Sequence, residues 1–321
     1  MDQEEGKSTG FVYSPSFLTH ETGPGHPESP RRLEAILDHL RTSRVWHLLR
    51  PVTPNAAGVD LMGLVHSREY VDSVSRACSR GVKVLDGGDT VVCENSHSVA
   101  LLAAGGVVEG IRLIFEDSIE NAFCAVRPPG HHAGVDQAMG FCLFNNAAIG
   151  ARFAQKEYRL ERVMIVDWDV HHGNGTQHIF ESDPTVFYVS LHQYPFYPGT
   201  GNEIETGRGR GLGMTRNFPL SAGGGDHEYL DIFRNKIPDI AAKFSPELII
   251  LSSGFDAHEK DPLANMRVST EVFMEMTQII HEIASEWCGG RLVSILEGGY
   301  SLDALQECTE VHLNVLAGGP D

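Results

Sequence analysis

The sequence has little of what marks secreted, membrane-spanning or nucleic-acid-binding proteins. Its 6 cysteines include no CxxC spacing, and Cys124 and Cys142 lie in apolar runs, so we expect reduced thiols that ligate no metal. Lysine and arginine number 25 against 43 acidic residues, and the formal charge of −18 argues against direct nucleic-acid binding. The acidic N-terminus lacks the apolar region of a signal peptide, and we expect no apolar run of membrane-spanning length.

These absences favour a soluble, intracellular protein of the cytoplasm or nucleus, although a cleaved organellar transit peptide would leave no trace. The acidic charge favours cationic ligands or partners, and the alternative is an ordinary acidic surface. The oligomeric state stays open at this point.

Apolar runs rich in β-branched residues alternate with helical patterns along the whole chain. We predict strands over 10–13, 122–126, 163–166, 186–191, 248–251 and 292–296. We predict helices over 29–49, 96–115, 145–157, 228–242, 270–287 and 301–316. Near-continuous apolar strands separated by helices are typical of a parallel sheet covered on both faces. With no internal repeat and no linker, residues 1–321 are expected to form a single α/β domain.

The segment 165–175 is the most informative, because an apolar run ends there in acids, histidines and glycines. Alternate side chains of an extended segment point the same way, so Asp169 and His171 can bind one cation, with Asp167 one step deeper. Asp256, at the end of another apolar run, is the best remote third ligand. The alternatives are an ordinary polar loop for the first segment and a helix cap for Asp256.

Three ligands leave coordination positions free for water and substrate, which is typical of a catalytic metal. One nitrogen and two carboxylates suit zinc, and Fe(II), Co(II) and Mn(II) also accept such ligands.

Polar residues also follow the other predicted strands. The clusters are Arg127 to His132, Asp167 to Asn174, Ser190 to His192, Ser253 to Asp256, and Glu297 to Tyr300. Ligands of open α/β sheets bind at the carboxyl ends of the strands, so we expect the five loops to form one active site there.

Within these loops, the adjacent His131 and His132 suit proton transfer, and their alternative role is metal binding. Tyr300, after two glycines, can donate to a developing oxyanion. Together the residues predict metal-assisted hydrolysis of a carbonyl compound, without specifying which one.

The order and spacing of the motifs resemble the zinc-dependent histone deacetylase family, over most of the chain. The motifs are Arg127-Pro-Pro-Gly-His-His-Ala133, Gly140-Phe-Cys-Leu-Phe-Asn-Asn146, Asp167-Trp-Asp-Val-His-His-Gly-Asn-Gly-Thr-Gln177, Ser190-Leu-His192, Ser253-Gly-Phe-Asp-Ala257 and Leu296-Glu-Gly-Gly-Tyr300. The form of the third motif resembles the class II branch and the acetylpolyamine amidohydrolases. The resemblance implies a three-layer α/β/α, arginase-like fold with an eight-stranded, mainly parallel sheet and an active site at the carboxyl ends of its strands.

The resemblance also implies roles for single residues. Zinc would be held by Asp169, His171 and Asp256, while His132 acts as general base beside His131. Tyr300 would donate to the oxyanion, and Asp167 would orient His131. Asn174 stands where the class I pattern has an aspartate that orients the second histidine, and a neutral acceptor should stabilise imidazolium less.

Further implied sites are less central to the chemistry. Potassium would bind at Asp167, Ser190 and Leu191 with the backbone of Asp169 and His171. A second potassium ion would bind near Phe180, Asp183, Val186 and Met214.

A substrate tunnel would be walled by Phe141 and Tyr197, narrowed by Gly140, with Leu263 at its mouth; the alternative for Phe141 and Tyr197 is core packing. Leu263 matches a position that is apolar in lysine deacetylases, whereas a glutamate there is associated with acetylpolyamines. The expected substrate is therefore the acetylated lysine of a protein or peptide, in chromatin or elsewhere. The alternatives are a deacetylase of acetylpolyamines or other small acylated amines, and a non-catalytic acyl-lysine-binding protein.

Overall fold

The computed structural model describes residues 8–319, and the acidic N-terminus that was expected to lack a signal peptide lies outside them. An eight-stranded sheet runs through the described chain in the order β2-β1-β3-β8-β7-β4-β5-β6, and every neighbouring pair is parallel. The strands are β1 (Thr9–Val12), β2 (Leu49–Val52), β3 (Ala122–Cys124), β4 (Val163–Asp167), β5 (Val186–Gln193), β6 (Thr215–Leu220), β7 (Leu248–Ser253) and β8 (Leu292–Leu296). The predicted α/β class and the eight-stranded sheet are confirmed.

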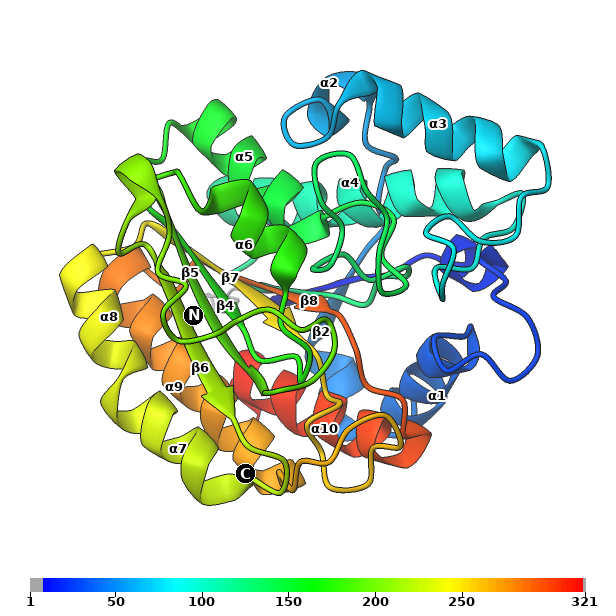
Figure 1. Cartoon of the computed structure of the whole chain (residues 1–321). Helices are drawn as coiled ribbons and strands as arrows, with labels where there is room; N and C mark the ends of the chain where they lie inside the picture. The colour runs from blue at the N-terminus through cyan, green and yellow to red at the C-terminus, as the bar shows by residue number, and fades with distance from the viewer. Residues whose placement is uncertain (1–7, 320–321) are drawn as a thin grey trace.

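Helices cover both faces of this sheet (Figure 1). One layer contains α2 (Val59–Met62), α3 (Arg68–Ser79), α4 (Ser96–Phe115), α5 (Asn146–Tyr158) and α6 (Asn174–Phe180). The other contains α1 (Arg31–Leu40), α7 (Asp226–Asn235), α8 (Ile237–Phe244), α9 (Thr270–Cys288) and α10 (Leu302–Leu316). The central strands β4, β7 and β8 are buried along their whole length, which explains their continuous apolar sequences.

Several predicted boundaries were wrong. The helix predicted over 29–49 ends at Leu40, and a 3-10 turn (Arg44–Leu48) leads into the edge strand β2. The helix predicted over 228–242 is two helices, α7 and α8, that meet at Lys236. Pro238, in the first turn of α8, has no N–H to continue the hydrogen bonds of α7.

The expectation that no apolar run reaches membrane-spanning length was also wrong. An 18-residue window of the 20-residue helix α4 has a mean hydropathy of 1.7, enough by length and composition to cross a membrane, and 61% of that window is buried inside the fold. A core helix passes the same test of length and composition. A Cβ at Gly105 would lie only 1.8 Å from the carbonyl oxygen of Asn55, so glycine lets α4 pack closely against that loop.

All six cysteines are free thiols in this structure, and five of them are buried.

A buried polar chain joins α9 and α10 to the sheet. His312 on α10 is fully buried, and its Nδ1 and Nε2 atoms lie 2.7 Å from Thr277 Oγ1 and 2.8 Å from Ser294 Oγ. Burial lowers the pKa of His312 to about 3, so its imidazole is neutral in the folded protein near pH 7.

The free energy of unfolding should therefore decrease as the pH falls below about 6.5. In that range the unfolded chain protonates His312, whereas the folded protein does so only near its lowered pKa of about 3. His312→Gln keeps a polar side chain but removes this proton uptake, so its stability should depend less steeply on pH, by up to about 1.4 kcal/mol per pH unit. Urea unfolding from pH 7 to pH 5 measures both slopes. Other buried histidines contribute equally to the pH dependence of both proteins. Equal slopes for the wild type and His312→Gln would contradict the assignment of a lowered pKa to His312.

Candidate active site

The ends of two neighbouring strands bring together Asp169, His171 and Asp256. Asp169 and His171 follow β4, Asp256 follows β7, and the two strands pair in register from Val163 with Leu248. One potential ligand atom from each residue lies within 4.8 Å of the others. The Nδ1 atom of His171 lies 3.2 Å from Asp169 Oδ1 and 3.1 Å from Asp256 Oδ2.

This cluster has the electrostatics of a cation site. Asp169 and Asp256 are fully buried, and burial together with the charge of Asp169 raises the pKa of Asp256. Burial would lower the pKa of His171, but its hydrogen bonds to Asp169 and Asp256 raise it to about 10. Two buried carboxylates and one imidazole are a donor set that fits zinc and related divalent metals.

Glycines allow backbone groups to approach the two carboxylates. Gly298 donates its N–H to Asp169 Oδ2 at 2.7 Å, and a Cβ at Gly298 would lie 2.2 Å from Asp256 Oδ2. Similarly, a Cβ at Gly254 would lie 2.1 Å from Asp169 Oδ2. These glycines are therefore required by the packing around the cluster.

The histidine pair lies beside the cluster, with different partners for the two rings. His131 Nδ1 lies 3.0 Å from Asp167 Oδ2, and His132 Nδ1 lies 2.7 Å from Asn174 Oδ1. The amide nitrogen of Asn174 donates to Met139 Sδ at 3.3 Å, so its oxygen faces His132. His132 Nδ1 must then carry the hydrogen, which leaves Nε2 as a free acceptor.

The two histidines also differ in charge. Burial opposes protonation of His131, but Asp169 and Asp167 raise its pKa to about 10. Burial lowers the pKa of His132 well below its usual value, and the neighbouring His131 and His171 lower it further. His131 is therefore the protonated member of the pair and His132 the neutral one.

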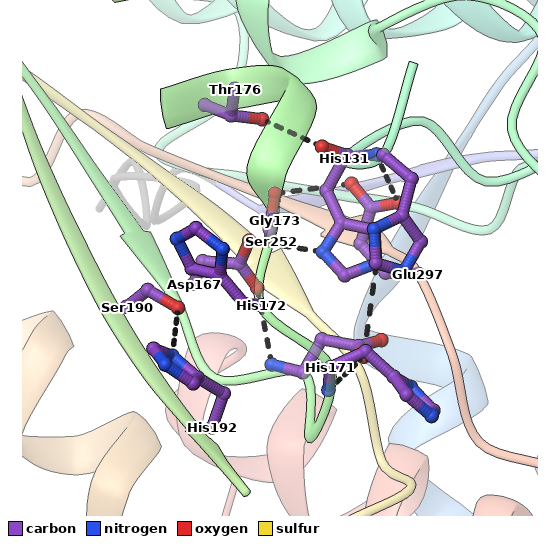
Figure 2. Close-up of polar contacts among 12 residues, drawn as sticks. His131, Asp167, His171, His172, Gly173, Thr176, Ser190, His192, Ser252 and Glu297 are labelled. Atoms are coloured by element: carbon purple, nitrogen blue, oxygen red, sulfur yellow. Dashed lines mark hydrogen bonds and ion pairs between the residues drawn. The ribbon is translucent and has the colours of Figure 1, made fainter. Parts of the chain in front are cut away.

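Sequence reasoning placed Glu297 in one of the five polar clusters but assigned no role to this buried acid next to the histidine pair. The Oε2 atom of Glu297 accepts the backbone N–H groups of Gly130 at 2.7 Å and His131 at 3.2 Å, and Oε1 accepts from Ser252 Oγ at 3.0 Å (Figure 2). Burial raises the pKa of Glu297 to about 7. Its position at the end of the apolar strand β8 was the available signal.

His131, Cys142 and Glu297 form a second group whose potential ligand atoms lie within 4.8 Å of one another. Burial raises the pKa of the Cys142 thiol well above its usual value and so disfavours the thiolate that binds a metal, which makes Asp169, His171 and Asp256 the better metal site.

A cavity of about 270 Å³ leads to these groups. The four predicted tunnel residues all line it, together with the catalytic candidates His132 and Tyr300, the metal-ligand candidate His171 and three residues that were not predicted. The complete lining is Pro27, Asp89, His132, Gly140, Phe141, His171, Phe196, Tyr197, Leu263 and Tyr300. The wall is tight, since a Cβ at Gly140 would lie 2.4 Å from the His132 ring. Among the missed residues, Phe196 stacks on His171 with 5.5 Å between ring centroids.

Tyr300 borders this cavity on the loop after β8. Its ring meets Phe141 edge-on at 5.9 Å and lies 5.0 Å from the Arg32 guanidinium carbon. Burial raises the pKa of Tyr300 well above its usual value, although Arg32 opposes this, so the phenol keeps its proton near neutral pH.

The potassium positions suggested by the sequence fall into two places. Asp167 and Ser190 are paired in register on β4 and β5, and Ser190 Oγ lies 2.8 Å from His192 Nδ1 (Figure 2). At the second place, Asp183 already pairs with Arg152 at 2.5 Å and accepts from Thr185. Asp167 is likewise paired, with His131 at 3.0 Å, so a potassium ion at either place would share its carboxylate with a side chain of the protein.

A parallel α/β sheet with two acids and an imidazole at its carboxyl edge is the arrangement of a metal-binding hydrolase. The family model of the histone deacetylase domain matches residues 26–316. The chain belongs to the histone deacetylase family, whose members are hydrolytic deacetylases and generally depend on a metal.

Three relatives illustrate this membership. "Histone deacetylase 10, chloroplastic" of Oryza sativa is 41% identical over 331 positions, covering 97% of this chain and 74% of the rice protein. "Polyamine deacetylase HDAC10" of Homo sapiens is 37% identical over 304 positions, covering 91% of this chain and 45% of the human protein. The crystal structure of the HDA15 HD domain matches with a TM-score of 0.92 at 41% identity, covering 98% of this chain and 89% of that one. The arginase-like deacetylase fold is thereby confirmed.

Asp256→Ala should abolish tight binding of a divalent metal, because only one buried carboxylate would remain beside His171. Elemental analysis of protein purified with zinc would measure this, with circular dichroism to check the fold. Asp226→Ala, on the surface helix α7, is the control and should keep its metal. Full metal content in folded Asp256→Ala protein would refute the assignment.

Proposed function

We propose that residues 1–321 act as one catalytic domain that hydrolyses an N-ε-acetyl-lysine of a protein or peptide. The observation that carries the proposal is the cavity of about 270 Å³, which is bordered by aromatic rings and ends at His132, His171 and Tyr300. A narrow apolar passage suits the aliphatic stem of lysine, and the polar groups at its end suit the amide.

Asp169, His171 and Asp256 would hold zinc. When bound, the metal supplies a Lewis acid that polarises a carbonyl and makes water more acidic. The residues of the chain itself provide the remaining chemistry.

His132 is the general base in this proposal. Its Nδ1–H donates to Asn174, so Nε2 can accept a proton from the attacking water, and that proton is then available to the leaving amine. The low pKa of His132 keeps this acceptor free at neutral pH. Asp167 holds His131 in place and pairs with its charge.

Tyr300 is the proposed oxyanion donor. Its phenol is protonated and borders the cavity, where a hydrogen bond to the developing negative charge would be stronger than in water.

Potassium would bind at Asp167, Ser190 and Leu191 with the backbone of Asp169 and His171. The support is the buried carboxylate of Asp167, whose pKa is raised by burial and which has a hydroxyl-bearing strand partner in Ser190. A second ion near Phe180, Asp183, Val186 and Met214 would have to share Asp183 with Arg152.

Deacetylation of polyamines or other small acylated amines is the second candidate. Asp89 at the cavity and the net charge of −18 favour cationic substrates, and a human relative is named a polyamine deacetylase. Leu263 at the mouth favours acetyl-lysine, since it offers no charge for a polyamine.

A side-by-side assay of an acetyl-lysine peptide and acetylspermidine separates the two candidates. A higher kcat/KM for the peptide supports the first, and a higher value for acetylspermidine overturns it. Binding of the peptide with no turnover by zinc-loaded protein would instead indicate a non-catalytic reader.

The free thiols support an intracellular site of action, in the cytoplasm, the nucleus or an organelle.

Tyr300→Phe and His132→Ala should each keep the metal and lose about a hundredfold or more in kcat, because each removes a group that acts in the transition state. Steady-state kinetics with elemental analysis would check this. An unchanged kcat/KM in either variant would contradict the role of that residue.

Asn174→Asp should move the acidic limb of the kcat/KM profile to higher pH. A carboxylate stabilises imidazolium better than an amide does, so the pKa of His132 should rise. The base would then become protonated, and therefore inactive, at a higher pH than in the wild type. Rates measured from pH 5 to pH 9 would reveal the shift, and an unshifted limb would count against His132 as the base.

A further inference from the structure

The segment that carries Tyr300 depends on partners from elsewhere in the chain. Two glycines precede Tyr300, and Gly299 has a φ of +115°, so the segment has little conformational restraint of its own. Buried Arg32 donates to the carbonyl oxygens of Glu297 at 2.6 Å and Gly299 at 2.7 Å. These contacts hold the carbonyl oxygens of Glu297 and Gly299, whereas the N–H of Tyr300, on the opposite side of the Gly299 peptide plane, needs a restraint of its own.

Asp261 supplies that restraint from the loop after β7. Its Oδ2 atom accepts the backbone N–H groups of Tyr300 at 2.7 Å and Ser301 at 3.2 Å. Its Oδ1 atom accepts the N–H of Leu263 at 2.9 Å. The Asp261 side chain is nearly inaccessible, with 7% relative exposure, so water cannot easily replace these bonds.

Helix capping does not account for this arrangement. Ser301 is the N-cap residue of α10, and its own side chain accepts from Ala304 N–H. The shorter of the two bonds to Oδ2 is to Tyr300, which precedes the cap. Asp261 therefore holds the backbone of Tyr300, the residue that carries the phenol, as well as the backbone of the N-cap residue Ser301.

We propose that Asp261 is a positioning residue that sets the phenol of Tyr300 and links it to Leu263 in the cavity wall. One carboxylate holds both walls of the cavity, because Leu263 and Tyr300 both line it. This inference rests on the proposed function, in which Tyr300 donates to the oxyanion.

The test uses Asp261→Asn and Asp261→Ala in the zinc-loaded full chain. Asparagine keeps the shape of aspartate but has one acceptor oxygen, so its amide nitrogen must face the N–H of either Leu263 or Tyr300. We expect kcat on the acetyl-lysine peptide to fall about ten- to a hundredfold, with KM and zinc content nearly unchanged. Asp226→Asn is the matched control, because Asp226 lies on the surface and its carboxylate likewise accepts a backbone N–H, that of Ser269, together with the Ser269 hydroxyl. It should behave like the wild type.

A double-mutant cycle with Tyr300→Phe separates positioning from general damage. If Asp261 acts through the phenol, Asp261→Asn should have little further effect on kcat in the Tyr300→Phe background. An equal loss in both backgrounds, or no loss in the wild-type background, would overturn the inference. An unchanged kcat in Tyr300→Phe alone would instead overturn the proposed role of Tyr300. If Asp261→Ala fails to fold, the isosteric asparagine variant still completes the cycle.

Discussion

Buried negative charge at the carboxyl edge of the sheet is the constraint on which the rest of the site depends. Asp167, Asp169, Asp256 and Glu297 are all fully buried there. Burying a carboxylate is costly unless it is paired or hydrogen-bonded, and each of these acids has such partners in His131, His171 or backbone N–H groups. The residual charge around Asp169 and Asp256 is what a divalent cation would balance.

The same buried acids also organise the loops. Glu297 holds the turn that carries the histidine pair, while Asp261 holds the backbone of Tyr300. Both carboxylates bind main-chain amides, so they fix loop positions without restricting which side chains the loops present. Catalytic and metal-binding candidates at the ends of β3, β4, β7 and β8 can therefore lie on irregular segments and still keep a defined geometry.

The sequence predicts most of this arrangement, because central strands and strand-end ligands leave local patterns. The spacing of Asp169 and His171 was sufficient to predict that they share one cluster, although both lie in the bend after β4 and not in the strand itself. Edge strands β2 and β6 were missed because both contain proline and arginine and lack a continuous apolar run. The contributions of Phe196, Glu297 and Asp261 were missed for another reason, since they arise from partners distant in the chain, such as Asp261 and Tyr300 at 39 positions apart.

The central claim is that the Asp169 cluster holds a metal required for hydrolysis of an acetylated lysine. Mass spectrometry of an acetyl-lysine peptide incubated with the purified protein tests this directly, before chelation, after chelation, and after zinc is added back. The account predicts release of acetate that stops on chelation and returns with zinc. Deacetylation that continues unchanged in metal-free protein would contradict it.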